Sequence, residues 1–190
     1  GNQIRSGLSD EVPESEWMSL ESNEIFNDDN FLFADVGAGL LWFSVFDEKI
    51  KLVEQRMEGK GIELVNQSIR DFAYADRSMF EIVIQNLLAN ALKFCSSGDT
   101  ITVANHISNG SCIISVSDTG IGISKHNIDK LFKNTTFTTT GTNNEKGTGL
   151  GLSICKELVE LNNGKIWVES TLNVGSTFYV QLPKSRPNGD

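Results

Sequence analysis

The chain has 190 residues, enough for one globular domain with a hydrophobic core, and a formal net charge of −9 at pH 7. An acidic surface disfavours general binding to nucleic acid or anionic membranes, because both reward basic patches. No apolar stretch approaches the ~18 residues of a membrane span, and no signal segment is visible. We therefore expect a soluble cytoplasmic domain without direct contact to nucleic acid or membrane, with the anchorage of its parent protein left open.

The first half of the chain predicts a tail, two helices and a strand. Residues 1–29 are polar and acidic without a steady period, and we expect a poorly ordered tail or connector there. From Asp35 a helical pattern places on one stripe Phe43, Phe46, Ile50, Val53 and Met57, and the glycines at 58–61 end it. A short strand follows at Ile62–Val65. Asp76 is the expected N-cap of a second helix to Phe94, with an apolar stripe of Phe80, Val83, Ile84, Leu87, Leu88 and Ala91.

The second half predicts a hairpin, a long loop, a helix and two strands. Two alternating runs joined by Ser108, Asn109 and Gly110 are typical of a β-hairpin. Residues 131–146 are dominated by Thr, Asn and Gly, as in lids and binding segments. A helix from near Gly149 is expected to bury Ile154, Cys155, Leu158 and Val159, and strands follow at Lys165–Ser170 and Ser176–Leu182. This order favours a two-layer α/β sandwich with a mostly antiparallel sheet and its helices on one face.

Three cysteines are odd in number and lack metal-binding spacing: Cys95, Cys112 and Cys155. This pattern indicates reduced, buried thiols in a reducing compartment rather than a disulfide framework.

Two glycine clusters are candidates for ligand contact. Gly147, Gly149 and Gly151 open a helix, where unpaired N–H groups and the helix dipole suit a polyphosphate, although a plain loop-to-helix turn explains one such cluster equally well. In the second cluster Asp118 could accept a hydrogen bond from an exocyclic amine, while Gly120 and Gly122 leave room for a flat ring. The alternative for Asp118 is a turn former.

A polar stripe on the second helix is the third candidate. Asn86, Asn90 and Lys93 fall at i, i+4 and i+7, opposite the apolar stripe. An asparagine carbonyl oxygen is a hard ligand for Mg²⁺, and lysine supplies charge for phosphates. An ordinary solvated face is the alternative, but such a face is usually rich in Glu and Lys.

Together these features resemble the catalytic and ATP-binding domain of sensor histidine kinases, in the gyrase and mismatch-repair ATPase superfamily. Five motifs resemble, in order, its N box, first glycine box, F box, second glycine box and closing motif: Gln85–Phe94, Asp118–Gly122, Leu131–Phe137, Gly147–Leu152 and Gly175–Phe178. The resemblance implies a Bergerat-type sandwich of about five strands and three main helices over residues 30–184, with a tail at 185–190. It also implies ATP and Mg²⁺ as cofactors.

The resemblance further implies residue roles. Asp118 would bond the adenine amine, Asn90 would bind Mg²⁺, and Lys93 would meet the phosphates, with Asn90 and Lys93 as catalytic residues. Thr177 would complete the adenine contact through water. Asn86 would line the site, and the triphosphate would be wrapped under a mobile lid by Lys146, Gly147, Thr148, Gly149, Leu150, Gly151 and Leu152. The F box is one residue longer than usual and lacks the following arginine, so the γ-phosphate contact falls to Lys146 or Lys133.

The implied function is transfer of the ATP γ-phosphoryl group to a histidine on a separate dimerisation domain, with a response regulator downstream. His106 and His126 do not fit the acceptor pattern, so the acceptor lies elsewhere. Two alternative functions are a hydrolytic ATPase and a non-catalytic nucleotide-binding regulatory module. Hydrolytic relatives carry a glutamate where Asn86 stands, and an amide cannot act as a general base. Glu81, the nearest upstream carboxylate, is nine residues from Asn90 on another face of the helix, so we expect very slow hydrolysis.

Overall fold

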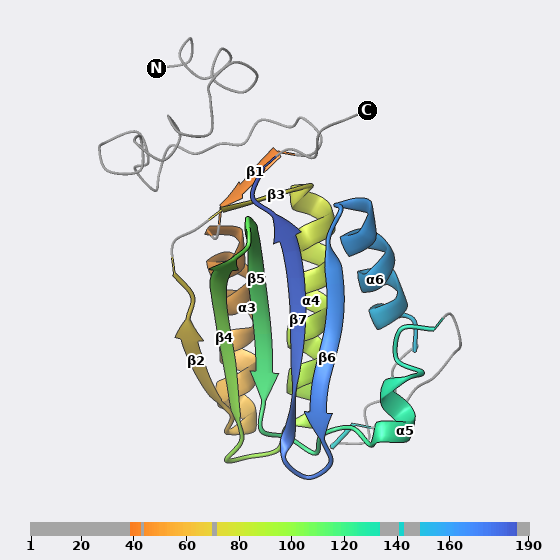
Figure 1. Ribbon diagram of the computed structural model, residues 1–190. Coiled ribbons are helices and arrows are strands. Elements are labelled where there is room, and N and C mark those ends of the chain that lie inside the picture. Colours follow the sequence, from red (N-terminus) through yellow and green to blue (C-terminus); the bar gives the residue numbers. More distant parts are fainter. Residues whose placement is uncertain (1–38, 43, 70–71, 134–140, 143–148, 186–190) are drawn as a thin grey trace. The chain divides into compact units, whose positions relative to one another are not determined.

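A mixed five-stranded sheet forms the centre of the fold, in the order β2-β4-β5-β7-β6 (Figure 1). Its strands are β2 (Glu63–Gln67), β4 (Thr100–Ser108), β5 (Ser111–Asp118), β7 (Gly175–Pro183) and β6 (Lys165–Thr171). Only the β2–β4 pairing is parallel, and the other three are antiparallel. The sheet is therefore mostly antiparallel, as the order of elements predicts.

Three main helices cover one face of this sheet: α3 (Ser44–Lys60), α4 (Arg77–Phe94) and α6 (Gly151–Leu161) (Figure 1). A short helix, α5 (Lys125–Ile128), follows β5. A separate antiparallel pair is formed by β1 (Gly39–Trp42) and β3 (Phe72–Ala75). The computed structural model describes residues 39–42, 44–69, 72–133, 141–142 and 149–185. The predicted tail at 1–29 lies outside these ranges, as does the predicted tail at 185–190 apart from Ser185.

The hydrophobic core lies between the sheet and the helices. β4 and β5 alternate buried and partly exposed residues, as expected for a sheet with one covered face. The predicted stripe of α4 is buried and extends to Leu92. On α3, Ile50, Val53 and Met57 are buried, whereas the side chains of Phe43 and Phe46 lie outside the description. The three cysteines are buried and free, as predicted.

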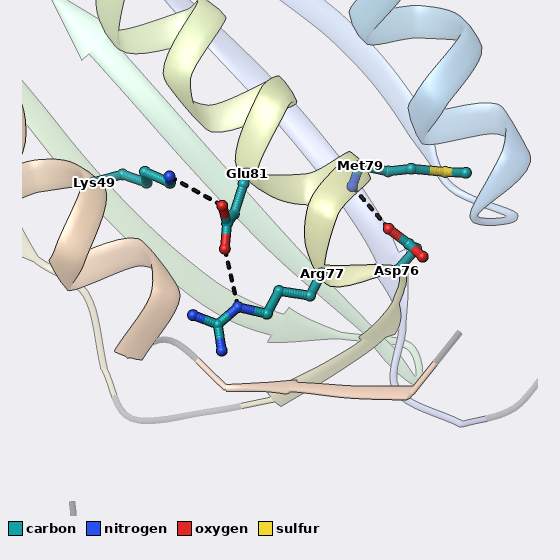
Figure 2. Close-up of polar contacts among 5 residues, drawn as sticks. All are labelled: Lys49, Asp76, Arg77, Met79 and Glu81. Atoms are coloured by element: carbon teal, nitrogen blue, oxygen red, sulfur yellow. Dashed lines mark hydrogen bonds and ion pairs between the residues drawn. The ribbon is translucent and has the colours of Figure 1, made fainter. Parts of the chain in front are cut away.

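The residues that the sequence indicates as a helix cap and a hairpin turn adopt those structures. Asp76 adopts the N-cap position of α4 and accepts a hydrogen bond from Met79 N at 2.8 Å (Figure 2). Asn109 and Gly110 both have positive φ, the geometry of a tight hairpin turn between β4 and β5. Among the described residues, no helix has the length and apolarity needed to cross a bilayer.

The structure corrects two expectations. Residues 39–42 form strand β1 rather than part of a helix from Asp35, because they pair with β3, a strand that local pattern did not predict. Ile154 is 42% exposed rather than buried, because α6 turns Cys155 and Val159 into the core.

Candidate functional site

Asp118, the last residue of β5, is a buried carboxylate at the end of the sheet. Its side chain is 8% exposed and accepts a hydrogen bond from Gly120 N at 3.0 Å. Burial raises the pKa of Asp118 to about 6, against the opposing effect of backbone hydrogen bonds from Gly120 and Ser176. A carboxylate has about four acceptor sites, so Asp118 can still accept a donor from a ligand.

The glycines after Asp118 allow this loop to close on the protein backbone. A side chain on Gly120 would collide with the carbonyl oxygen of Phe94, the last residue of α4. At Gly122, where φ is +64°, a side chain would collide with the backbone of Thr171. Ile121 N also donates to Phe94 O at 3.2 Å. These glycines are therefore needed for close packing against α4 and β6, a reason distinct from the expected room for a flat ring.

The polar stripe of α4 extends to the start of α6. Asn86, Asn90 and Lys93 are partly exposed, and Asn86 Oδ1 lies 2.7 Å from the β-carbon position that a side chain at Gly151 would occupy. Gly151 is the first residue of α6, and its N-cap Leu150 has no side-chain acceptor for the first N–H groups. Gly149 has a φ of +75°. The start of α6 thus suits an anion beside the Asn86 side chain.

Three of the predicted motifs therefore meet around α4. The first glycine motif joins the end of the helix at Phe94, and the second contacts its middle at Asn86. Gly149, Leu150, Gly151 and Leu152 are described at the beginning of α6. Lys146, Gly147 and Thr148 lie outside the described residues, whereas Lys133 is described and exposed.

Thr177 does not lie beside Asp118. The antiparallel register pairs Asp118 with Ser176, and Ser117 with Thr177. Since neighbouring side chains of a strand point to opposite faces, Thr177 lies on the other side of the sheet, where its Oγ1 lies 2.8 Å from Ser117 Oγ. Ser176, which sequence reasoning missed, is 6% exposed on the Asp118 side. Only the strand register could have identified it.

Glu81 is held in an ion-pair network on α4 (Figure 2). Arg77 Nε lies 2.9 Å from its Oε1, and Lys49 Nζ from α3 lies 3.0 Å from its Oε2. The hydrogen bond from Arg77, followed by that from Lys49, keeps the pKa of Glu81 below its usual value despite partial burial. A carboxylate so paired is a weak base, which agrees with the expectation that Glu81 cannot activate a water.

Across the described ranges, no group of three or more His, Cys, Asp and Glu side chains could hold a metal ion. Asn90 offers one amide oxygen from a partly exposed position. That donor set fits Mg²⁺, which takes few protein ligands and fills its octahedron with water and phosphate oxygens.

Comparison with known proteins identifies the family. Residues 75–186 match the family described as histidine kinase-, DNA gyrase B-, and HSP90-like ATPase. The adaptive-response sensory kinase SasA of Synechococcus elongatus is 35% identical over 145 residues, covering 75% of this chain and 37% of that protein. Histidine protein kinase DivJ of Caulobacter vibrioides is 38% identical over 109 residues, covering 57% of this chain and 18% of DivJ. The chain spans about a third of the length of its SasA relatives.

Solved structures agree with this assignment. The catalytic domain of histidine kinase ThkA superposes with a TM-score of 0.68 at 28% identity, covering 78% of this chain and 97% of that one. ThkA in complex with the response regulator protein TrrA matches with a TM-score of 0.64 at 25% identity, covering 78% and 42%. The chain therefore belongs to the histidine kinase-, DNA gyrase B- and HSP90-like ATPase family, and contains the ATP-binding catalytic domain of a histidine kinase.

Proposed function

We propose that this domain, within a longer cytoplasmic histidine kinase, binds ATP with Mg²⁺ and directs the γ-phosphoryl group to a histidine on a separate dimerisation domain. A response regulator would then receive the phosphoryl group. The observation that carries the proposal is the connection of the motifs: the loop after Asp118 is bonded to the end of α4 at Phe94, and Asn86 of α4 lies against Gly151 of α6. The candidate contacts to adenine and to the phosphates are thus both connected to α4.

The residues divide the work by their chemistry. Asp118 accepts a hydrogen bond from the exocyclic amine of adenine, and Lys93 supplies positive charge to the phosphates. Asn90 would give one oxygen to Mg²⁺, which would neutralise phosphate charge. The glycines and N–H groups at 146–152 hold the polyphosphate.

The phosphoacceptor belongs to another domain. Its imidazole nitrogen forms a bond to the γ-phosphorus as the bond to the ADP oxygen breaks, ADP leaves, and the ring loses its N–H proton. His126 is a poor candidate, because its Nε2 lies 2.8 Å from Lys130 Nζ on the surface. His106 is exposed on β4, where it pairs with Ile113.

Two features disfavour hydrolysis as the main reaction. Asn86 has an amide where a general base would be needed, and Glu81 is neutralised by Arg77 and Lys49. A neutral imidazole needs less activation than water, so the site suits a histidine acceptor.

The test mixes the purified chain, Mg²⁺ and γ-labelled ATP with the dimerisation domain of its parent kinase. We expect labelled histidine on that domain, none on this chain, and very slow phosphate release. Phosphate release at about one per second that is lost in Asn86→Ala would instead identify a hydrolytic ATPase. ATP binding without transfer would identify a regulatory module, and phosphohistidine at His106 or His126 would contradict the acceptor assignment.

A further inference from the structure

The carboxyl-terminal end of α4 is capped by three segments that are distant in sequence. An α-helix leaves the carbonyls of its last turn without partners inside the helix. Ala91 O accepts a hydrogen bond at 3.1 Å from the N–H of Cys95, the residue directly after the helix. The next three carbonyls receive remote donors: Lys60 Nζ to Leu92 O at 2.8 Å, Thr142 N to Lys93 O at 3.1 Å, and Ile121 N to Phe94 O at 3.2 Å.

Thr142 is the centre of this cap. Its hydroxyl lies 2.7 Å from Cys95 O and 3.2 Å from Lys93 O, and its single proton favours the shorter contact. The same oxygen accepts a hydrogen bond from Lys60 Nζ at 3.1 Å. A hydroxyl can donate and accept at once, so Thr142 links the cation to the backbone beyond α4.

Lys60 brings a positive charge from the end of α3 to the end of α4. The side chain is partly buried and bonds both Leu92 O and Thr142 Oγ1. A cation beside the carboxyl-terminal end of a helix interacts favourably with the helix dipole, and hydrogen bonds from a charged donor are stronger than neutral ones. Lys60 therefore fixes the last turn of α4 from outside the helix.

The capped turn carries the proposed phosphate ligand. Lys93 contributes its carbonyl to the cap, and Asn90 lies less than one turn earlier. Binding groups need a fixed geometry, because a small displacement weakens every contact that they make. We propose that Lys60 and Thr142 are positioning residues, which hold the last turn of α4 so that Lys93 and Asn90 meet the phosphates of ATP. This inference rests on the proposed ATP binding.

The experiment compares variants that remove or keep each bond. Thr142→Val keeps the shape and backbone N–H but loses the hydroxyl, and Thr142→Ser restores it. Lys60→Met removes the cation, and Lys60→Arg keeps it. Lys51→Met, at an exposed position of α3, is the matched control. Affinities for Mg²⁺–ATP and for AMP are measured by calorimetry and NMR titration, beside the melting temperature.

We expect Thr142→Val and Lys60→Met each to weaken ATP binding by about five- to tenfold, because each removes two partly buried hydrogen bonds of the cap. AMP affinity should hold, since the bonds that are removed run to Leu92 O, Cys95 O and between Lys60 and Thr142, and the bond of Ile121 N to Phe94 O beside Asp118 is kept. Thr142→Ser and Lys51→Met should bind like the parent chain. The double variant should lose less than the sum of the two single losses, because the bond between Lys60 and Thr142 is removed in both single variants.

Two results would overturn the inference and separate it from the proposed function. If the variants melt earlier but keep their ATP-to-AMP affinity ratio, Lys60 and Thr142 only stabilise the fold. If the unaltered chain does not bind ATP, the proposed function fails and the positioning role fails with it.

Discussion

Asn86 Oδ1, on α4, lies 2.7 Å from the point at which a side chain on Gly151 would begin, at the start of α6. Real β-carbons do not approach an oxygen so closely, so a side chain at position 151 would require the Asn86 side chain to move. Asn86 also donates from Nδ2 to Ile82 O at 2.8 Å, which limits its freedom to move aside. The contact joins the N box to the second glycine box.

Gly151→Ala should therefore weaken ATP binding by about tenfold while the melting temperature changes little. Alanine favours a helix over glycine by about 1 kcal/mol, which offsets the strain of displacing Asn86. Calorimetric titration of Gly151→Ala, Asn86→Ala and the double variant checks this. In the double variant, Gly151→Ala should cause no further loss of ATP affinity, because Asn86→Ala has already removed the side chain that it displaces. Losses of affinity that add up would show that the two residues do not interact. Gly59→Ala, on α3 with no heavy atom within 4 Å of the new carbon, is the control.

Asp118→Asn should stabilise the ligand-free domain at pH 7. The folded-state pKa of Asp118, about 6, lies above its ordinary value of 3.8. The stabilising effect of the protonated carboxyl is thus complete below pH 3.8 and is lost as pH rises through about 6. Asparagine avoids burying a charge, so urea unfolding at pH 7 should give a free energy of unfolding higher by up to about 2 kcal/mol. The difference should shrink toward pH 4, and a gain independent of pH would contradict this cause.

The same Asp118→Asn variant should lose its preference for ATP over GTP. The new amide can present a donor to the amine donor of adenine, where the carboxylate presented an acceptor. Competition titrations with both nucleotides measure the ratio. A variant more stable than the parent chain but poorer in adenine selectivity would show that Asp118 is retained for binding and not for folding, whereas an unchanged ratio would exclude its contact with the base.

Asn90→Ala should abolish the dependence of ATP binding on Mg²⁺. Chelation of Mg²⁺ should weaken ATP binding to the parent chain by about tenfold or more, because the phosphates then lose their counter-charge. The alanine variant should start at the weakened value and show little response to chelation. Ser78→Ala, at an exposed position of the same helix outside the N box, should behave like the parent chain. A full Mg²⁺ response in Asn90→Ala would remove Asn90 from the metal site.

Glu81→Gln should destabilise the domain at pH 7 by about 0.5–1 kcal/mol, a small value because the carboxylate is 27% exposed and screened. The pKa of Glu81 is lowered, so its stabilising effect is present above the usual value of 4.5 and is lost as pH falls through the folded-state pKa. The unfolding curves of the parent chain and of Glu81→Gln should therefore differ at pH 7 and coincide near pH 3. Phosphate release should not change, and a large fall would mean that Glu81 acts as a base.

Local sequence patterns predicted those helices and strands whose buried residues recur with the period of the helix or strand itself. The apolar stripe of α4 was predicted from a 3.6-residue period, and its capping by Asp76 from side-chain chemistry, because both act within a few residues. The β4–β5 hairpin followed from a turn that needs positive φ at Asn109 and Gly110. The motifs that resemble histidine kinases were likewise legible in the chain, since their spacing is a property of the sequence.

Only the tertiary structure decided what depends on pairing between distant segments. Residues 39–42 form strand β1 by pairing with β3, which is distant in sequence. The local pattern of these residues does not reveal this pairing, so it could not exclude a helix. The register of β5 and β7 puts Ser176 beside Asp118 and Thr177 on the opposite face, and a shift of one residue would exchange them. The cap that Lys60 and Thr142 form over α4 joins residues 82 apart, and such contacts are set by how whole elements pack.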